Sequence, residues 1–160
     1  MYKSVPTPEQ AYQKARHYCA YQERCHQEVK EKLYGFGLRK SDVEPLISRL
    51  IEEDLLNEER FAKQFAGGHF RLKKWGKQKI LHALRLKRVS EYNIRKALQE
   101  IDDKDYQKLV ASLARTKWNA LKDNQYIIRE TKTRNYLLQK GFEPQVVSAE
   151  LKALRTQSHA

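Results

Sequence analysis

Apolar residues recur every three or four positions along most of the chain, and no stretch of four to eight residues alternates apolar and polar side chains. The first pattern is typical of amphipathic helices, whereas the second would indicate half-buried strands, so we predict an all-α fold. Most of the glycines and prolines fall between the helical segments, where they mark turns. The predicted helices cover residues 9–22, 26–34, 42–53, 57–70, 77–86, 91–101, 104–121, 127–139 and 144–154.

Pro45 is the one proline that falls neither in a predicted turn nor at a predicted helix end. Proline is tolerated in the first turn of a helix, because the amides there have no intrahelical carbonyl partner. We therefore expect Ser41 or Asp42 to cap this helix, which would place Pro45 in its first turn.

The nine predicted helices form three triplets whose apolar positions repeat. Counted from Leu33, apolar residues follow at offsets 5, 10, 14 and 17, and the same offsets from Leu84 and Leu137 are apolar as well. Unrelated helical hairpins would share part of this pattern, but the gapless match across three triplets favours a true repeat. The aligned sets are Leu38, Val43, Ile47 and Leu50; Val89, Ile94, Leu98 and Ile101; and Phe142, Val147, Leu151 and Leu154.

The match fails one helical turn before the origin, where Val29 and Ile80 correspond to Thr133 in the third triplet. Each triplet has one apolar stripe that must be buried against its own neighbours, so we predict tandem three-helix modules. Such modules can be joined into an elongated, curved body. The predicted parts are an N-terminal tail (1–8), modules 1 (9–56), 2 (57–103) and 3 (104–155), and a C-terminal tail (156–160).

The excess of positive charge lies entirely after residue 70. The formal net charge is +12, yet residues 1–70 contain equal numbers of basic and acidic side chains, and residues 71–96 contain ten basic residues with Glu91 as the only carboxylate. A polyanion is therefore the expected partner, although such a charge run is also typical of a solvated helix face. Phe70 and Trp75 lie among these cations, a mixture that suits stacking on single-stranded bases.

The sequence shows no constellation that predicts catalysis or a cofactor. His17, Cys19, Cys25 and His26 are competent zinc ligands, but residues two apart on a helix point in nearly opposite directions, so we interpret the cysteines as ordinary reduced thiols. A helix-turn-helix reader of duplex sequence is also disfavoured, because the predicted helix 91–101 offers few side chains for base edges. We expect a protein that is not an enzyme and that binds no metal.

No apolar run approaches the roughly 20 residues that a bilayer crossing requires, and the first ten residues lack the apolar stretch of a signal peptide. Two cysteines are too few for a disulfide-stapled secreted scaffold. We therefore expect a soluble, cytoplasmic protein with no membrane contact.

Five segments carry a resemblance when they are taken together in this order: ARHYCAYQERCHQEVKEKL (15–33), EDLLNEERF (53–61), EERFAKQF (58–65), KWGKQKI (74–80) and ALRLKRVS (83–90). They resemble the RecX family of bacterial regulators of the RecA recombinase. The similarity is good over residues 10–103 and only architectural over 104–155.

The resemblance implies a modular all-helical protein that binds the RecA–DNA filament in its helical groove. It implies inhibition of filament extension, ATP hydrolysis and strand exchange in recombination, DNA repair and the SOS response. The implied partners are the RecA filament and single-stranded DNA, with double-stranded DNA as a further candidate, and the implied state is a monomer. The alternative hypothesis is a stand-alone basic nucleic-acid-binding protein without a recombinase partner.

We call residues 71–96 the basic segment, and we assign contacts with phosphate or with an acidic filament surface to residues within it. Trp75 has a competing interpretation, since beside Gly76 it could fill a gap between modules. The assigned residues are Arg71, Lys73, Lys74, Trp75, Lys77 and Lys79, with Arg85, Lys87 and Arg88 in support, and the predicted core of module 2 is Phe61, Phe65, Ile80, Leu84, Ile94 and Leu98.

Two features depart from the family pattern. Cys25 stands where the family often has a capping serine, and a thiol is a poor acceptor for the free amides of a helix start, so we expect a weak cap there. Gly67 and Gly68 fall inside a predicted helix, where each costs about 1 kcal/mol relative to alanine. We expect a bend or an early helix end at these glycines.

Overall fold

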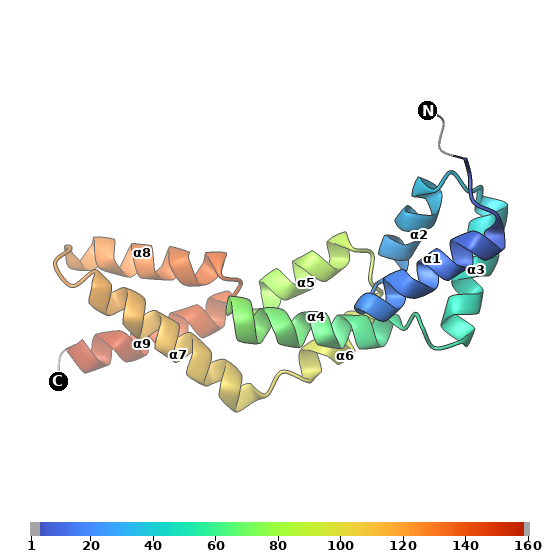
Figure 1. The fold of residues 1–160 in the computed structure, drawn as a ribbon. Helices are drawn as coiled ribbons and strands as arrows, with labels where there is room; N and C mark the ends of the chain where they lie inside the picture. The colour runs from blue at the N-terminus through green and yellow to red at the C-terminus, as the bar shows by residue number, and fades with distance from the viewer. Residues whose placement is uncertain (1–3, 159–160) are drawn as a thin grey trace. The chain divides into compact units, whose positions relative to one another are not determined.

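The computed structural model describes residues 4–158, and every regular element within that range is an α-helix (Figure 1). The predicted all-α fold is therefore confirmed. The first three residues of the predicted N-terminal tail and the last two of the C-terminal tail lie outside the described residues. The helices are α1 (Pro8–Tyr21), α2 (His26–Gly35), α3 (Lys40–Glu52), α4 (Glu58–Lys73), α5 (Lys77–Leu86), α6 (Glu91–Gln99), α7 (Asp103–Ala120), α8 (Tyr126–Gln139) and α9 (Pro144–Ser158).

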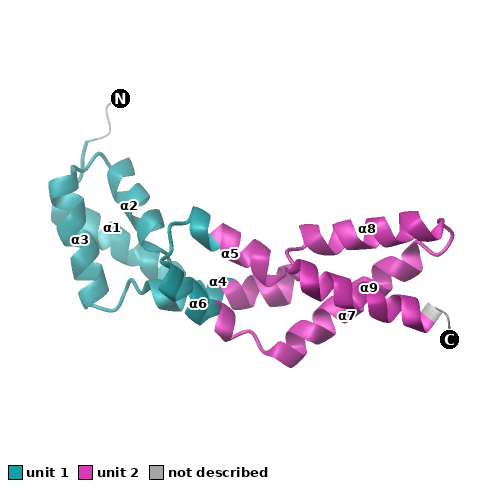
Figure 2. Cartoon of the chain, turned by 180° about the vertical axis from the view of Figure 1, so that it is seen from behind, with its two compact units in different colours: residues 1–65, 84–97 teal, residues 66–83, 98–160 magenta. Residues whose placement is uncertain are grey.

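The chain divides into two compact units (Figure 2). Unit 1 comprises residues 1–65 and 84–97, and its helices α1, α2 and α3 pack against one another. Unit 2 comprises residues 66–83 and 98–160, and in it α7, α8 and α9 pack against one another. The middle helices α4, α5 and α6 contribute residues to both units, and the division into three modules at residues 56 and 103 stays a prediction.

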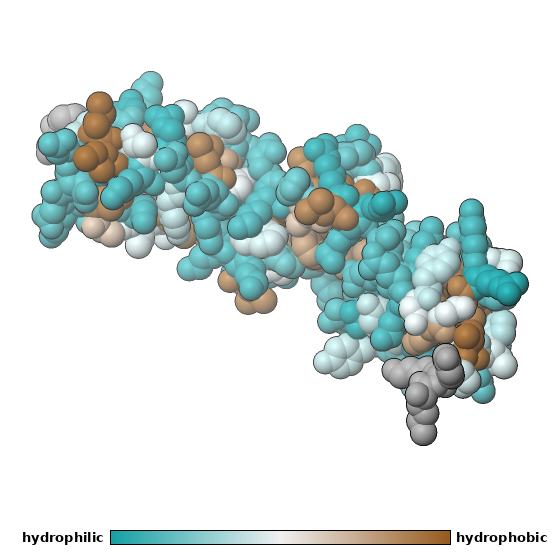
Figure 3. Space-filling model, turned by 90° about the horizontal axis from the view of Figure 1, so that it is seen from above, coloured by the Kyte–Doolittle hydropathy of each residue, from teal (hydrophilic) through white to brown (hydrophobic). Residues whose placement is uncertain are grey.

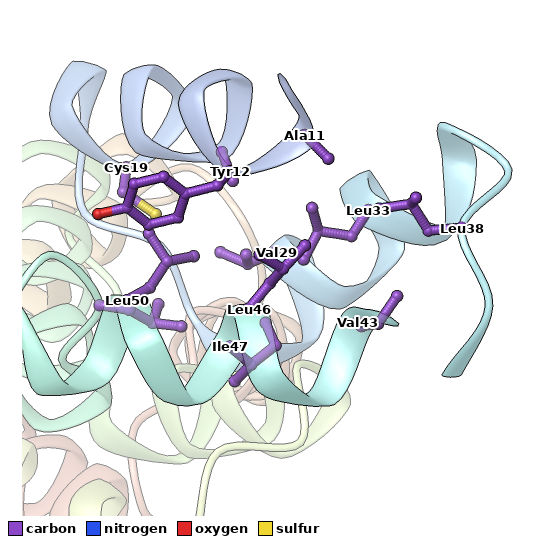
Figure 4. Packing of buried hydrophobic residues seen from close by; sticks show 12 residues of the cluster. Ala11, Tyr12, Cys19, Val29, Leu33, Leu38, Val43, Leu46, Ile47 and Leu50 are labelled. Atoms are coloured by element: carbon purple, nitrogen blue, oxygen red, sulfur yellow. The ribbon is translucent and has the colours of Figure 1, made fainter. Parts of the chain in front are cut away.

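The core of unit 1 is formed by the apolar faces of its first three helices (Figure 4). Leu33 of α2 and Leu50 of α3 are fully buried beneath α1 residues that include Tyr12. The Tyr12 hydroxyl donates to the Glu53 carboxylate at the end of α3, and the Arg49 guanidinium carbon lies 3.5 Å from the centre of the Tyr12 ring. Burial of each large side chain stabilises this unit by roughly 1.5–3 kcal/mol.

The repeat predicted from the apolar pattern is present in the backbone. Leu33, Leu84 and Leu137 are all inaccessible to solvent, and of the twelve residues aligned behind them all but Leu98 are buried. Four residues after each leucine the chain adopts a left-handed conformation, with φ of 91° at Gly37, 59° at Arg88 and 97° at Gly141. Each of these residues also donates its amide to the carbonyl three positions earlier. The three triplets therefore turn from their second to their third helix in the same way.

Thr133 shows that the repeat extends to the position where the sequence match fails. Thr133 is 0% exposed, as are Val29 and Ile80 at the equivalent positions. Its hydroxyl donates to the Arg129 carbonyl one turn earlier at 2.8 Å, so this buried hydroxyl has a hydrogen-bond partner. A threonine satisfied by its own helix therefore packs as a β-branched apolar residue would.

Two predictions about helix starts have different outcomes. The predicted cap of α3 is wrong, because α3 begins at Lys40 after Arg39, and no side chain caps it. Ser41 and Asp42 thus lie inside the helix and Pro45 lies beyond its first turn. The weak cap at Cys25 is confirmed: it precedes α2 without a side-chain cap, and its thiol donates instead to Glu28 at 3.2 Å.

An early helix end at Gly67 and Gly68 is also wrong, since α4 continues to Lys73, and the alternative, a bend at these glycines, stays a prediction. The Arg71 guanidinium lies against Gly67, where a Cβ atom would approach its Nη1 atom to 2.9 Å. Other differences at helix ends are small, except that α9 runs four residues beyond its predicted end at 154. In the predicted core of module 2, Phe65 and Leu98 are only partly buried, and the other four residues are buried.

The surface seen in Figure 3 is mainly hydrophilic, with separate apolar patches. Over residues 4–158, none of the helices has both the length and the apolar composition that a bilayer crossing needs.

Replacing Thr133 tests whether its position is an apolar site of the repeat. We expect Thr133→Val to leave the free energy of unfolding within about 0.5 kcal/mol of the wild type, since it keeps the β-branched shape and the hydroxyl has no partner outside its own helix. Thr133→Ala should lower it by about 1 kcal/mol or more, because a cavity remains. Both values come from urea unfolding followed by circular dichroism, and a larger loss for valine than for alanine would contradict the assignment.

Candidate functional site

Six of the predicted contact residues lie in unit 2, from the last turn of α4 through the α4–α5 turn into α5. Arg71, Lys73, Lys74 and Lys79 are exposed. Lys74 directly follows α4 and has a φ of 57°, and Trp75 then donates its amide to the His69 carbonyl at 3.2 Å, so the chain reverses tightly before α5. This reversal places Lys74 and the residues after it against another part of the unit.

That part is the α8–α9 turn, which contacts the α4–α5 turn backbone to backbone. The Gly76 amide donates to the Lys140 carbonyl at 2.7 Å, and the Gln78 amide donates to the Gly141 carbonyl at 2.9 Å. A Cβ atom on Gly76 would overlap the Gly141 carbonyl, and one on Gly141 would overlap Lys79. We call this contact the glycine junction, because both residues must be glycine for the two turns to approach so closely.

The glycine junction brings Lys140 into the basic segment, although sequence reasoning did not single it out. The Lys140 ammonium donates to the Lys73 carbonyl at 2.9 Å. Partial burial lowers the pKa of Lys140 from its ordinary value, and repulsion by the Lys79 and Lys74 ammonium groups lowers it further. None of these four lysines is ion-paired with a carboxylate among residues 4–158. The two turns therefore form a group of cations with uncompensated charge.

The start of α5 is held by Tyr106 of α7. Its hydroxyl accepts a hydrogen bond from the Lys77 amide at 3.0 Å and donates one to the Glu143 carboxylate. Burial and this carboxylate raise the pKa of Tyr106, so the hydroxyl stays protonated as a donor. Tyr106 and Gly141 accept hydrogen bonds from the first two amides of α5, so these two amides are not available to a ligand. The exposed lysine side chains are the available donors.

Trp75 is only partly buried and lies between a histidine and a lysine. Its ring centre is 4.6 Å from that of His69, and the Lys79 ammonium lies 4.7 Å from it. The Lys79 contact is a cation–π interaction of the kind worth roughly 0.5–1 kcal/mol at an exposed site. Both predicted roles for Trp75, ligand contact and gap filling, stay predictions, and the structure adds contact with Lys79.

Lys77 differs from its neighbours because it has partners within unit 2. Its ammonium lies 3.7 Å from an Asp103 carboxylate oxygen and 4.8 Å from the centre of the Tyr106 ring. It is partly buried, so it is less available to a ligand than Lys74 or Lys79.

The three supporting residues, Arg85, Lys87 and Arg88, belong to unit 1. Arg85 makes two hydrogen bonds to the Glu91 carboxylate, at 2.7 and 3.2 Å, and Lys87 lies 3.7 Å from a Glu28 carboxylate oxygen. Arg88 is exposed and makes no ion pair within the described range. Two of the three charges are thus partly neutralised by carboxylates.

The two cysteines are buried free thiols. Burial raises the pKa of Cys19 to about 11 and that of Cys25 to about 12, so neither is a reactive thiolate near neutral pH. Among residues 4–158, no group of three or more histidine, cysteine, aspartate or glutamate side chains is arranged to hold a metal ion.

Comparison with known proteins identifies the family of this chain. The family model described as the second three-helix domain of RecX matches residues 57–98. Regulatory protein RecX of Prosthecochloris aestuarii is 31% identical over 146 residues, which make up 91% of this chain and 94% of that protein. The chain belongs to the RecX family. The resemblance seen in the sequence is thereby confirmed.

Other RecX proteins differ from this chain in length. Regulatory protein RecX of Clostridium perfringens strain 13 is 32% identical over 123 residues, which are 75% of this chain but 57% of that protein. The chain therefore spans little more than half the length of this relative. A crystal structure of RecX from Lactobacillus salivarius matches with a TM-score of 0.85 at 24% identity, covering 93% of this chain and 97% of that one. This likeness supports the all-helical repeat fold.

The glycine junction can be tested by adding one methyl group at a time. We expect Gly76→Ala and Gly141→Ala each to lower the free energy of unfolding by about 2 kcal/mol or more, because the new Cβ meets fixed backbone. Gly68→Ala is the matched control: nothing lies within 4 Å of its Cβ position, and alanine favours the helix by about 1 kcal/mol, so stability should rise. Thermal and urea unfolding measure whether each variant is less or more stable than the wild type. Equal changes in stability at all three sites would contradict the close contact.

Proposed function

We propose that this RecX-family chain regulates the RecA recombinase by binding the RecA–DNA filament and inhibiting its extension, ATP hydrolysis and strand exchange. The observation that carries the proposal is the group of unpaired lysines at the glycine junction, held on a helical repeat whose relatives are named regulatory proteins. Inhibition by this route is stoichiometric, since it requires occupation of the filament and no chemical step.

Electrostatics explains why a filament is a suitable partner. Exposed charges act over a Debye length of about 10 Å at 0.1 M salt, so separated cations add their attraction only when the partner is itself an extended polyanion. Unit 2 contains five basic residues between positions 71 and 79, and its fold brings Lys140 beside them. A nucleoprotein filament offers repeated negative charge to such a group, whereas a small anionic ligand would meet only some of its members.

The alternative function, a stand-alone nucleic-acid-binding protein, rests on the same cations and differs in the partner. If phosphate neutralisation alone drives binding, affinity for bare single strands should fall with salt at a log–log slope of about −0.7 per contacted phosphate. A filament regulator additionally contacts the recombinase, so its affinity for coated DNA exceeds its affinity for bare DNA. The two functions therefore differ in one measurable ratio.

Titrating the protein onto bare and RecA-coated single strands measures that ratio. We expect at least tenfold tighter binding to the coated strand at physiological salt, together with a fall in ATP hydrolysis at stoichiometric protein. Fluorescence anisotropy reports binding, and a coupled assay reports hydrolysis. Equal affinities with unchanged hydrolysis would discard the regulatory function and leave the alternative.

Charge removal tests whether the unpaired lysines carry filament binding. The triple variant Lys73→Ala, Lys74→Ala and Lys79→Ala should weaken filament binding at least tenfold, while the thermal midpoint changes little because exposed charges contribute little to stability. Lys77 is left intact because it pairs with Asp103. The matched control removes three exposed lysines of unit 2 from α7, α8 and α9, and it should bind nearly as the wild type does: Lys108→Ala, Lys132→Ala and Lys152→Ala.

Equal weakening in both triple variants would show that only net charge matters. That result would contradict a specific surface at the α4–α5 turn. A large fall in the thermal midpoint of the first variant would instead mean that these lysines stabilise the fold.

A further inference from the structure

Three lysines, of which one is distant in the sequence from the other two, have their backbones fixed around the glycine junction. Lys74 follows the last residue of α4, Lys79 lies in the first turn of α5, and Lys140 begins the α8–α9 turn. Lys140 bonds through its ammonium to the carbonyl of Lys73, the residue before Lys74, and its neighbour Gly141 contacts Lys79. The backbone contact, rather than side-chain flexibility, thus sets where the three side chains start.

We propose that Lys74, Lys79 and Lys140 together bind one phosphodiester group of a nucleic-acid strand, and that Trp75 is the positioning residue for Lys79. This inference rests on the proposed function, because it names the component of the filament that this surface contacts. It assigns the contact to the DNA backbone and not to an acidic protein surface.

The chemistry of the donors favours phosphate over a protein carboxylate. An ammonium group is a compact point charge with three donors and no preferred plane, whereas the planar guanidinium group matches a carboxylate in a bidentate pair. All three donors here are lysines, and the nearby Arg71 guanidinium lies back against Gly67 of its own helix. Lysine ammonium groups at several angles suit the tetrahedral oxygens of a phosphodiester.

The charge of the site also favours an anion of this kind. Lys140 is disfavoured as a cation by burial and by the ammonium groups of Lys79 and Lys74, and no carboxylate among residues 4–158 pairs with any of the three. A phosphodiester seated among them would reverse that repulsion into attraction for all three side chains at once. Because the junction already holds their backbones, little further ordering is needed when the phosphate binds.

Trp75 contributes by restricting Lys79. The Lys79 ammonium lies 4.7 Å from the centre of the Trp75 ring, whose own centre is 4.6 Å from that of His69. A lysine side chain loses rotamer entropy when it is fixed, so a ring that pre-orders it reduces the loss on binding. The indole thus acts through Lys79 and need not contact the strand.

The test uses the full chain and a fluorescein-labelled oligothymidylate single strand, over a series of salt concentrations. Each of Lys74→Gln, Lys79→Gln and Lys140→Gln should weaken binding about tenfold, since each removes one charge-assisted hydrogen bond. If the three lysines share one phosphate, the triple variant should lose about 0.7 from the log–log salt slope; three separate phosphates would give a loss of about 2.1. The control triple Lys108→Gln, Lys132→Gln and Lys152→Gln should keep the wild-type slope.

Folding is controlled within the same series. Lys74 and Lys79 are exposed, so their variants should keep the wild-type thermal midpoint. The midpoint of Lys140→Gln is measured as well, because the Lys140 ammonium donates to the Lys73 carbonyl. If Lys140→Gln unfolds, the double variant Lys74→Gln and Lys79→Gln still decides between the two cases. A loss of salt slope below about 0.7 indicates one shared phosphate, and a loss above about 0.7 indicates separate phosphates.

The Trp75 role has its own readout. Trp75→Leu should weaken binding severalfold with the salt slope unchanged, whereas Trp75→Phe should restore most of the affinity, because a phenyl face also attracts an ammonium. A leucine variant that loses slope as well would mean that Trp75 acts on the phosphate contact itself, and failure of phenylalanine to restore affinity would remove the positioning role.

Parallel titrations on RecA-coated strands separate this inference from the proposed function. Loss of affinity for both bare and coated strands supports the phosphate site. Loss for the coated strand alone assigns the lysines to an acidic protein surface and overturns the inference while the regulatory function stands. If the wild type binds coated and bare strands equally but the slope loss appears, the regulatory function fails and the phosphate site stands. A wild type that does not bind the bare strand at low salt, or variants that bind as the wild type does, overturn the inference.

Discussion

The close approach of Gly76 and Gly141 is the contact on which the candidate site depends. Two hydrogen bonds join the turns, at 2.7 and 2.9 Å, and any side chain at either glycine would separate them. The Tyr106 hydroxyl stabilises the same region, because it accepts a hydrogen bond from the Lys77 amide and donates one to the Glu143 carboxylate. Without this contact Lys140 would not reach the Lys73 carbonyl, and the basic segment would consist of residues close in sequence only.

The fold was largely predictable because helical periodicity is a local signal and because the repeat presents the same apolar pattern three times. The leucines at 33, 84 and 137 and their aligned positions are buried as the pattern indicates. The errors were local as well. Arg39, which offers no capping acceptor, precedes α3, and the α4 helix passes through Gly67 and Gly68, because packing outweighs a propensity cost of about 1 kcal/mol per residue. The burial of Thr133 was not predicted, because the sequence does not show that its hydroxyl forms a hydrogen bond within its own helix.

The candidate site was predictable only in part, since charge counts along a chain do not reveal pairing between distant residues. Lys87 lies near Glu28, 59 positions earlier, and Lys77 pairs with Asp103, so carboxylates that are distant in the sequence partly neutralise these two predicted contact cations. Lys140 was missed for the converse reason, because it joins the basic segment from the far end of α8. A signal was present in the sequence: Gly141 follows Lys140 at the repeat position that also holds Gly37.

The link between the two turns of unit 2 runs through main-chain atoms, and this affects how the unit responds to load. Side-chain contacts can slip between rotamers, whereas peptide groups joined at 2.7 and 2.9 Å move together. A strand pulling on the start of α5 would therefore pull α8 and α9 with it. The stiffness of this connection lets a force applied at one turn spread over several helices instead of unwinding one.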